Sequence, residues 1–316
     1  MRRVLVTGAA GFIGRPVVAA LLARGYSIHA TARPSSRAYP MPDAVTTHSC
    51  DLLNSTRLEA LVRSVRPEIL VHLGWVTTPG EYWESLENLD WLNASTDLFR
   101  YFLDAGGSHC LVAGTSAEYE WGTGGPLSET QSPLKPRFLY GSCKLALFHA
   151  ATALFSQRNI PLAWARLFCP FGPGESSLRL IPRTVLGLLR GEQLEVDAGV
   201  DIRDFMHVED IASAIATLVE RQVDGAVNVA SGEPMSVRAV IEEIAACLRA
   251  QAHIVFGAAR EPGLSPLSVV ASVGHLQKVA HWKPRTTFSE RIAQTCEYWR
   301  VRLREESGLE KSATVP

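Results

Sequence analysis

Short apolar runs alternate with segments of helical periodicity through the first two thirds of the chain. The β-branched run at 3–6 predicts a buried strand, and the apolar spacing over 16–24, before Gly25, predicts a helix. The same patterns continue along the chain, with strands expected at 28–31, 69–73, 110–113 and 162–167 and helices at 58–65, 93–105 and 140–157. Strands that alternate with helices are typical of a parallel sheet covered on both faces. The predicted fold class is therefore α/β, a Rossmann-type doubly wound parallel sheet.

The pattern changes after about residue 171, where prolines and a charged stretch at 201–204 interrupt it. Further elements are expected as a helix at 211–221, a strand at 226–229 and a helix at 237–248. We therefore expect a smaller C-terminal substrate-binding lobe that is interleaved with the sheet.

The expected domains follow from this change of pattern. Residues 1–170 form the dinucleotide-binding Rossmann domain, and 171–304 belong mainly to the substrate lobe. Part of 203–230 returns to the Rossmann domain. The polar tail at 305–316 lacks a pattern and is expected to be frayed.

Composition and charge narrow the classes of partner. The chain has 316 residues, is 47% hydrophobic and carries a formal net charge of −1 without a long basic run, so nucleic acid is not an expected partner. No stretch approaches the roughly 18 apolar residues of a membrane span. The 6 cysteines form no Cys-x-x-Cys pair, so no metal site is expected. Free thiols fit a reducing compartment, and a cytoplasmic location is expected.

A glycine-rich turn follows the first predicted strand and reads Thr-Gly-Ala-Ala-Gly-Phe-Ile-Gly over 7–14. In a dinucleotide-binding turn the first glycine permits the tight turn, the second lets the backbone approach the pyrophosphate, and the third allows close packing of helix and strand. Amide groups at the helix start then hold the diphosphate. The cofactor-binding residues predicted here are Gly8, Gly11, Phe12, Ile13 and Gly14. The alternative is a glycine-rich turn without a ligand.

The loop after the second predicted strand bears on which cofactor is bound. NAD sites place an acidic residue there, whereas NADP sites use an arginine. Here the loop contains Arg33 and Arg37 and no carboxylate over 31–37. Because guanidinium groups suit phosphate oxygens, NADP(H) is the preferred cofactor and NAD(H) is possible. In the alternative interpretation both arginines are solvated loop charges.

Tyr140 and Lys144 are four residues apart, so they share one face of a predicted helix. A neighbouring ammonium is expected to lower the pKa of the phenol and so fit Tyr140 for proton transfer to a carbonyl oxygen. Thr115 ends the preceding strand, where its hydroxyl can bond the reacting oxygen. Its alternative role is a helix or turn cap.

With these motifs the sequence resembles an extended short-chain dehydrogenase/reductase of the nucleotide-sugar epimerase/dehydratase type. The matching segments occur in family order at 7–14, 50–52, 72–74, 115–119, 140–144, 166–175, 203–210 and 228–232. The resemblance implies that Thr115, Tyr140 and Lys144 form the catalytic trio, with Tyr140 and Lys144 also contacting the cofactor.

The resemblance implies further binding residues. Asp51 and Leu52 would meet the adenine, although Asp51 has the alternative of a strand-end cap. Arg203 would bind the diphosphate of the sugar nucleotide, or else form an ion pair with Asp201 or Asp204. Arg260 would be a second diphosphate ligand.

Other positions are assigned more generally. His207 is expected to pack structurally. Aromatic loops at 74–83 and 118–121 would rim the sugar pocket or pack between elements. A homodimer through 93–105 and 140–157 is implied, with a nucleotide sugar as substrate.

Departures from the family pattern bear on the reaction and on the substrate pocket, and the Arg33 loop favours net reduction. Thr115 is followed by Ser116 and Ala117, where family dehydratases have Asp-Glu, so dehydration is not expected. Cys169 replaces the asparagine that contacts the sugar nucleotide in many epimerases. The leading hypothesis is NADPH-dependent reduction of a nucleotide-linked 4-keto-6-deoxyhexose to the 4-hydroxy sugar, in deoxysugar biosynthesis. The alternatives are an NAD-dependent nucleotide-sugar 4-epimerase and a non-catalytic nucleotide sensor.

Overall fold

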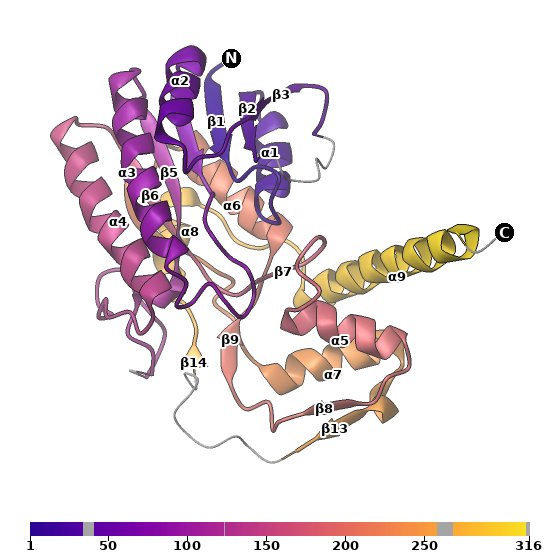
Figure 1. Ribbon diagram of the computed structural model, residues 1–316. Coiled ribbons are helices and arrows are strands. Elements are labelled where there is room, and N and C mark those ends of the chain that lie inside the picture. Colours follow the sequence, from indigo (N-terminus) through magenta and orange to yellow (C-terminus); the bar gives the residue numbers. More distant parts are fainter. Residues whose placement is uncertain (34–40, 123, 258–267, 314–316) are drawn as a thin grey trace.

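A parallel sheet forms the centre of the computed structural model, which describes residues 1–33, 41–122, 124–257 and 268–313. Its 7 strands follow the order β11-β6-β5-β4-β1-β2-β3, and every neighbouring pair is parallel (Figure 1). The strands are β1 (Arg3–Thr7), β2 (Ser27–Ala32), β3 (Val45–Ser49), β4 (Ile69–His72), β5 (His109–Thr115), β6 (Leu162–Leu167) and β11 (Gly225–Val229). The predicted Rossmann-type fold class is confirmed.

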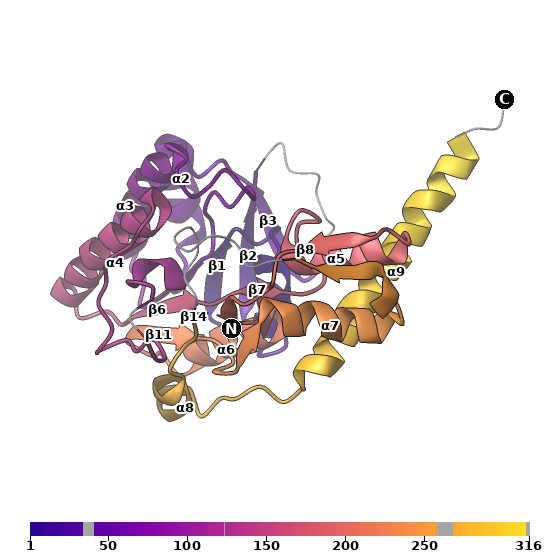
Figure 2. The same ribbon diagram turned by 90° about the horizontal axis from the view of Figure 1, so that it is seen from below.

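Helices cover both faces of this sheet. One layer contains α2 (Ser55–Val65), α3 (Glu87–Asp104) and α4 (Leu139–Gln157), and the other contains α1 (Gly14–Leu22), α6 (Val208–Glu220) and α8 (Gly274–Ala280). Figure 2 shows α2, α3 and α4 together along one side. Successive strand residues point to opposite faces, so Val4 and Val6 join one buried cluster whereas Leu5 joins the other. Both faces of the sheet are buried, which explains the continuous apolar runs of the central strands.

A smaller lobe has its own apolar core. It is built on α5 (Leu180–Leu189), α7 (Val237–Leu248) and α9 (Phe288–Ala313), around Val185, Ile244 and Ile292. The turn η1 (Ser116–Glu118) follows β5 within the sheet domain and packs against α4. The other short elements pair in three small sheets, β10-β7, β12-β9-β14 and β13-β8, apart from the turn η2. They are β7 (Pro170–Phe171), β8 (Leu194–Val196), β9 (Ile202–Asp204), β10 (Met206–His207), β12 (Pro234–Ser236), β13 (Ile254–Phe256), β14 (Ser268–Val269) and η2 (Gln251–His253).

Several elements differ from the sequence prediction, among them the helices α5, α8 and α9, for which no bounds were predicted. The edge strand β3 was not expected, because only Val45 in it is buried and no apolar run marks it. Helix α3 begins at Glu87 rather than at residue 93, because buried Asn88 is satisfied by the carbonyl oxygens of Tyr82 and Ser85. The expectation of a frayed tail from residue 305 is wrong as far as Ala313, where α9 ends.

The carboxyl ends of the parallel strands open onto the side of the sheet that faces the smaller lobe. Strand-end loops, the first turn of α4 and the segment before α5 all border a cleft there. Such an edge is where ligands bind in open α/β sheets. Within the described ranges, no helix has both the length and the apolar character that a membrane crossing requires.

Candidate active site

The glycine turn after β1 is closed too tightly for side chains at two of its positions. Gly8 has a φ of +67°, and a Cβ there would lie 2.8 Å from the amide nitrogen of Gly74. A Cβ at Gly14 would overlap the carbonyl oxygen of Gly8. Around Gly11, by contrast, a Cβ would meet only that oxygen, at 3.1 Å, and this residue borders the cleft. The turn therefore presents bare backbone to a ligand at the start of α1, as a dinucleotide requires.

One cleft of about 680 Å³ runs from this turn to Tyr140 and Lys144. The strand ends of β2 and β3 border its near end through Thr31, Ala32, exposed Arg33, Cys50 and Leu52, and Phe12 and Ile13 also face it. In a Rossmann-type fold, this end of the cleft is where the adenosine half of a dinucleotide binds. The carboxylate of Asp51 accepts a hydrogen bond from the amide of Leu53 at 3.1 Å, which is the cap alternative for this residue. Arg37 and Arg260 lie outside the described residues.

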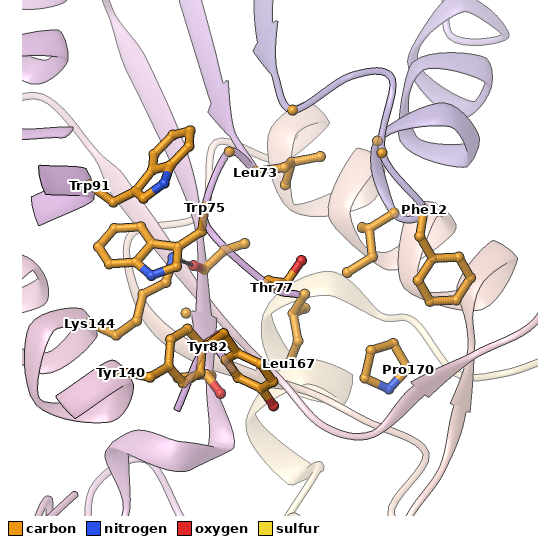
Figure 3. A pocket seen from close by; sticks show the side chains of 18 of the residues that line it. Phe12, Leu73, Trp75, Thr77, Tyr82, Trp91, Tyr140, Lys144, Leu167 and Pro170 are labelled. Carbon is orange, nitrogen blue, oxygen red and sulfur yellow. Dashed lines mark hydrogen bonds between the residues drawn. The ribbon is translucent and has the colours of Figure 1, made fainter. Parts of the chain in front are cut away.

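Tyr140 and Lys144 lie on the first turns of α4, beside the end of β5 (Figure 3). The helix approaches η1 closely because Gly141 has no side chain, and a Cβ there would overlap the carbonyl oxygen of Ala117. The amide of Tyr140 also donates to the carbonyl oxygen of Trp83 at 3.0 Å. The close approach at Gly141 and this hydrogen bond together position Tyr140 relative to the end of β5.

Thr115 has the cap role that was considered for it, and it also contacts Tyr140. Its hydroxyl accepts from the amide of Ala117 at 3.2 Å, so it caps η1. It is also hydrogen-bonded to Tyr140, and this bond lowers the pKa of the phenol. The structure thus brings the three residues of the predicted trio to one end of the cleft.

The phenol and the amine of this pair are both deprived of water. Burial raises the pKa of Tyr140 above its ordinary value, against the opposing bond from Thr115. Burial lowers the pKa of Lys144 to about 7, and the charge of Glu118 opposes this shift. The expectation that Lys144 lowers the pKa of Tyr140 is therefore not met in the protein alone. Instead, Nζ of Lys144 donates to the carbonyl oxygen of Ala113 at 2.9 Å and lies 3.8 Å from the centre of the Trp75 ring.

A fully buried ion pair lies next to the end of β5. Nε of Arg166, on β6, donates to Oε2 of Glu118 at 2.7 Å, and both side chains are completely buried. The other oxygen of Glu118 accepts from the amide of Thr115 at 2.8 Å and from Nε1 of Trp164 at 2.9 Å. Glu118 therefore positions the backbone of Thr115.

Arg203 and Arg179 border the far end of the cleft, toward the smaller lobe. Arg203 donates to Asp201 at 2.8 Å, which is one of the ion pairs considered from the sequence. Asp204 instead accepts from the backbone of Ser231, Gly232 and Ala271. Arg179 was missed in the sequence, although it stands directly before the apolar start of α5.

Glu175 is a second residue that the sequence did not single out. It is 6% exposed, borders the cleft, and its Oε2 is buried without a hydrogen-bond partner. Burial raises its pKa to about 8, and nearby Arg179 opposes this shift. Cys169 also borders the cleft. His207 caps α6 through its Nδ1 and packs edge-on against Phe171, so it has a structural position.

Aromatic side chains from three segments form a wall beside Tyr140, and Figure 3 shows Tyr82 next to it. The rings of Tyr82 and Tyr140 meet edge-on with centroids 5.0 Å apart. Trp83 contacts Trp121 at 6.0 Å and Phe138 at 5.0 Å between ring centroids. Since Trp83, Trp121 and Phe138 are only partly buried and border the cleft, the wall offers apolar faces to a ligand.

A metal site would need several ligand side chains close together in the part of the chain that the structure describes. No group of three or more histidine, cysteine, aspartate or glutamate side chains there could hold a metal ion.

Comparison with known proteins places these features in context. The model of the "NAD dependent epimerase/dehydratase family" matches residues 4–230. GDP-6-deoxy-D-mannose reductase from Pseudomonas aeruginosa is 29% identical, over 96% of this chain and 99% of that protein. A 3-diazoavenalumate denitrifying reductase from a Streptomyces species is also 29% identical, over 73% of this chain and 77% of that protein. The structure is similar to that of the Thermus thermophilus UDP-glucose 4-epimerase in complex with NAD, with a TM-score of 0.83, 25% identity, and coverage of 94% of this chain and 99% of that one.

Proposed function

The chain belongs to the NAD dependent epimerase/dehydratase family, and from this premise we propose that it is an NADPH-dependent reductase of a nucleotide-linked 4-keto-6-deoxyhexose. The observation that carries the proposal is the set of residues at the end of the cleft that holds Tyr140. There Tyr140 contacts Thr115, and the two residues after Thr115 are Ser116 and Ala117 rather than a carboxylate pair. Proton donation to a carbonyl oxygen is available at this place, but the carboxylate pair that family dehydratases have directly after the threonine is not.

Tyr140 acts as the acid in this reaction. A reduced nicotinamide dinucleotide, held by the glycine turn after β1, would supply the hydride to the C4 carbonyl carbon of the sugar. Because burial raises its pKa, Tyr140 is protonated at neutral pH and can donate its proton to the carbonyl oxygen. Thr115 orients the same oxygen through its hydroxyl. The nearby ammonium of Lys144, on the next turn of α4, stabilises the negative charge of the phenolate that remains.

Glu118 does not replace the missing carboxylate pair. Both of its oxygens already accept hydrogen bonds, from Arg166, Trp164 and the amide of Thr115. Its side chain is completely buried and is not among the residues that border the cleft. A dehydratase role is therefore not supported.

The aromatic wall supports a 6-deoxy substrate. In a 4-keto-6-deoxyhexose the C6 methyl group is attached to the carbon next to the carbonyl, so it lies within reach of whatever surrounds Tyr140. The faces of Trp83, Trp121 and Phe138 would remove that methyl group from water. A C6 hydroxyl in the same place would lose its hydrogen bonds to water without replacement.

The arginines that border the cleft support binding of a sugar nucleotide and of NADPH. Arg203 and Arg179 are suited to the diphosphate of the sugar nucleotide, since guanidinium groups bind phosphate oxygens in pairs. Exposed Arg33 is suited to the 2′-phosphate of NADPH.

A second candidate is a nucleotide-sugar 4-epimerase that uses the same trio with retained NAD. The similarity to the T. thermophilus enzyme over 94% of the chain favours it. An epimerase oxidises and then re-reduces C4, so it consumes no cofactor overall. The absence of a carboxylate from the cleft-lining ends of β2 and from residues 31–37 favours the reductase instead.

The test incubates the purified protein with NADPH and a panel of 4-keto-6-deoxy sugars linked to different nucleoside diphosphates. The expected result is loss of the absorbance of reduced nicotinamide, together with a product that is two hydrogens heavier. Tyr140→Phe should lower turnover about 10²–10⁴-fold while NADPH still binds. Tyr101→Phe, on α3 and away from the cleft, is the matched control. Conversion between C4 epimers without net use of NADPH would establish the epimerase, and an unchanged cellular role of the Tyr140→Phe variant would favour a sensor.

We also propose that the protein is a homodimer that pairs through α3 and α4. These helices pack against one another, and Leu89 on α3 is 44% exposed. Light scattering on the protein eluted from a size-exclusion column would give the mass of the particle directly. Leu89→Glu should shift this mass toward that of the monomer.

A further inference from the structure

Trp75 has a contact that the proposed reaction does not yet use. It follows β4 by a few residues, borders the cleft, and its ring centre lies 3.8 Å from Nζ of Lys144 (Figure 3). Nζ also donates to the carbonyl oxygen of Ala113 at 2.9 Å. The ammonium therefore contacts both a strand-end carbonyl and an aromatic face.

The orientation of the indole is fixed independently of Lys144. Its Nε1 donates to Oδ1 of Asn88 at 2.8 Å, and Asn88 is completely buried. The amide nitrogen of Asn88 in turn donates to the carbonyl oxygens of Tyr82 and Ser85, both at 2.7 Å. Trp75 is thus anchored to the start of α3 and to the loop that carries part of the aromatic wall.

Lys144 has little other compensation for its charge. Its side chain is 3% exposed. The charged and titratable groups around it are Glu118 on η1, His72 on β4 and Tyr140 one turn earlier on α4. Glu118 is paired with Arg166, and His72 is bonded to Thr7 and Ser95. The negative face of an aromatic ring attracts a cation, and this attraction grows when water is excluded.

We propose that Trp75 is a positioning residue for Lys144, whose charged ammonium it holds against β5 at the catalytic end of the cleft. This inference rests on the proposed function for its catalytic meaning, but the contact itself can be measured without any substrate. If the ring supports the charged form, an aromatic replacement retains that support whereas an aliphatic one of similar bulk does not. Trp75→Phe and Trp75→Leu form this matched pair.

The experiment follows the pH titration of the lysine ε-carbons by NMR in protein labelled at that position. The lysines are Lys135, Lys144, Lys278, Lys283 and Lys311, and Lys144→Arg identifies the resonance of interest. In the unaltered protein the Lys144 resonance should titrate at about pH 7 because burial lowers its pKa to that value. The midpoint in Trp75→Leu should lie about 0.4 to 1.5 pH units below that in Trp75→Phe.

Identical midpoints in the two variants would overturn the proposal, and so would a Lys144 that titrates with the other lysines. A second measurement needs no substitution and protects against variants that do not fold. The indole N–H resonance of Trp75 should shift with the same midpoint as Lys144, whereas that of Trp282, bonded to Ser213 outside the cleft, should not. An unresponsive Trp75 resonance would also overturn the proposal.

Activity separates this inference from the proposed reaction. If the reductase is correct, Trp75→Leu should lower kcat more than Trp75→Phe and shift the pH dependence of kcat in the same direction as the NMR midpoint. Lack of reductase activity with the expected NMR difference would refute the reaction and leave the contact established. Reductase activity with identical NMR midpoints would support the reaction and refute the proposed role of Trp75.

Discussion

Glu118 and Arg166 form a salt bridge of 2.7 Å in which neither side chain has any exposed surface. The pair joins η1 to β6 and places the amide of Thr115, which donates to the same carboxylate. A buried charge is tolerated only when it is paired and hydrogen-bonded, so each partner depends on the other. The end of β5 that carries Thr115 therefore depends on a residue from the neighbouring strand.

Removal of one partner should destabilise the fold strongly. Arg166→Ala leaves the carboxylate of Glu118 buried without its ion pair, and the expected loss in the free energy of unfolding is about 3–5 kcal/mol. The exposed pair between Arg190 and Glu192 offers a control, because Arg190→Ala should cost less than about 1 kcal/mol. Denaturant unfolding measures both values. Similar small losses in the two variants would contradict this account of the buried pair.

His72 makes the stability depend on pH. Burial, and secondly the charge of Lys144, lower its pKa from 6.5 to about 3, and its ring nitrogens are bonded to Thr7 and Ser95. Because the folded pKa is depressed, the contribution is fully present above pH 6.5 and is lost as the pH falls toward 3. In that window His72 should contribute a slope of about 1.4 kcal/mol per pH unit to the free energy of unfolding.

The measurement is denaturant unfolding at several pH values for the unaltered protein and for His72→Gln. The variant should be less stable at neutral pH and should show a shallower acid slope by about one proton. The same substitution at exposed His281 controls for the loss of an imidazole elsewhere. An acid slope that is unchanged in His72→Gln would show that this residue is not kept neutral by the fold.

Much of the architecture follows from the hydrophobic pattern. The bounds predicted for β6 and α7 agree with the structure at both ends, because one is a continuous buried run and the other has a strongly periodic apolar face. Strand β3 escaped prediction because it lies at the sheet edge and is mostly exposed. Long-range contacts decide such elements, and no local pattern records them.

The site was only partly predictable for the same reason. Motifs identified Tyr140, Lys144 and the glycine turn, whose spacing is local. The contact of Trp75 with Lys144 joins a strand-end loop to a helix far along the chain. The raised pKa of Tyr140 depends on burial, which a motif does not contain. Arg179 lies just beyond the matching segment at 166–175 and gave no signal of its own.

Glu175 should make ligand binding depend on pH. Burial raises its pKa to about 8, so it is neutral at pH 7 and gains a charge above pH 8. A carboxylate that borders the cleft would then repel the diphosphate of a bound nucleotide. The affinity for a nucleoside diphosphate sugar should fall about tenfold from pH 7 to about pH 9.5.

Glu175→Gln mimics the neutral form and should bind with an affinity that changes little over this range. Calorimetric titrations of both proteins provide the comparison, and Glu192→Gln, at an exposed position, is the control. If the unaltered protein and Glu175→Gln show parallel curves, Glu175 does not face the ligand.

Arg33 should decide the choice of cofactor. It is exposed at the end of β2 and borders the cleft where the adenosine ribose of a dinucleotide would lie. Charge-assisted hydrogen bonds to a 2′-phosphate are worth about 1.5–3 kcal/mol, so Arg33→Ser should lower kcat/KM for NADPH about 10–100-fold and leave that for NADH nearly unchanged. Arg33→Asp should go further and favour NADH, because a carboxylate there accepts bonds from the ribose hydroxyls and repels the phosphate. Arg57→Ser, at an exposed position on α2, controls for the loss of a surface charge. Equal use of NADPH and NADH by the unaltered protein would remove Arg33 from the cofactor site and would strengthen the case for an epimerase with retained NAD.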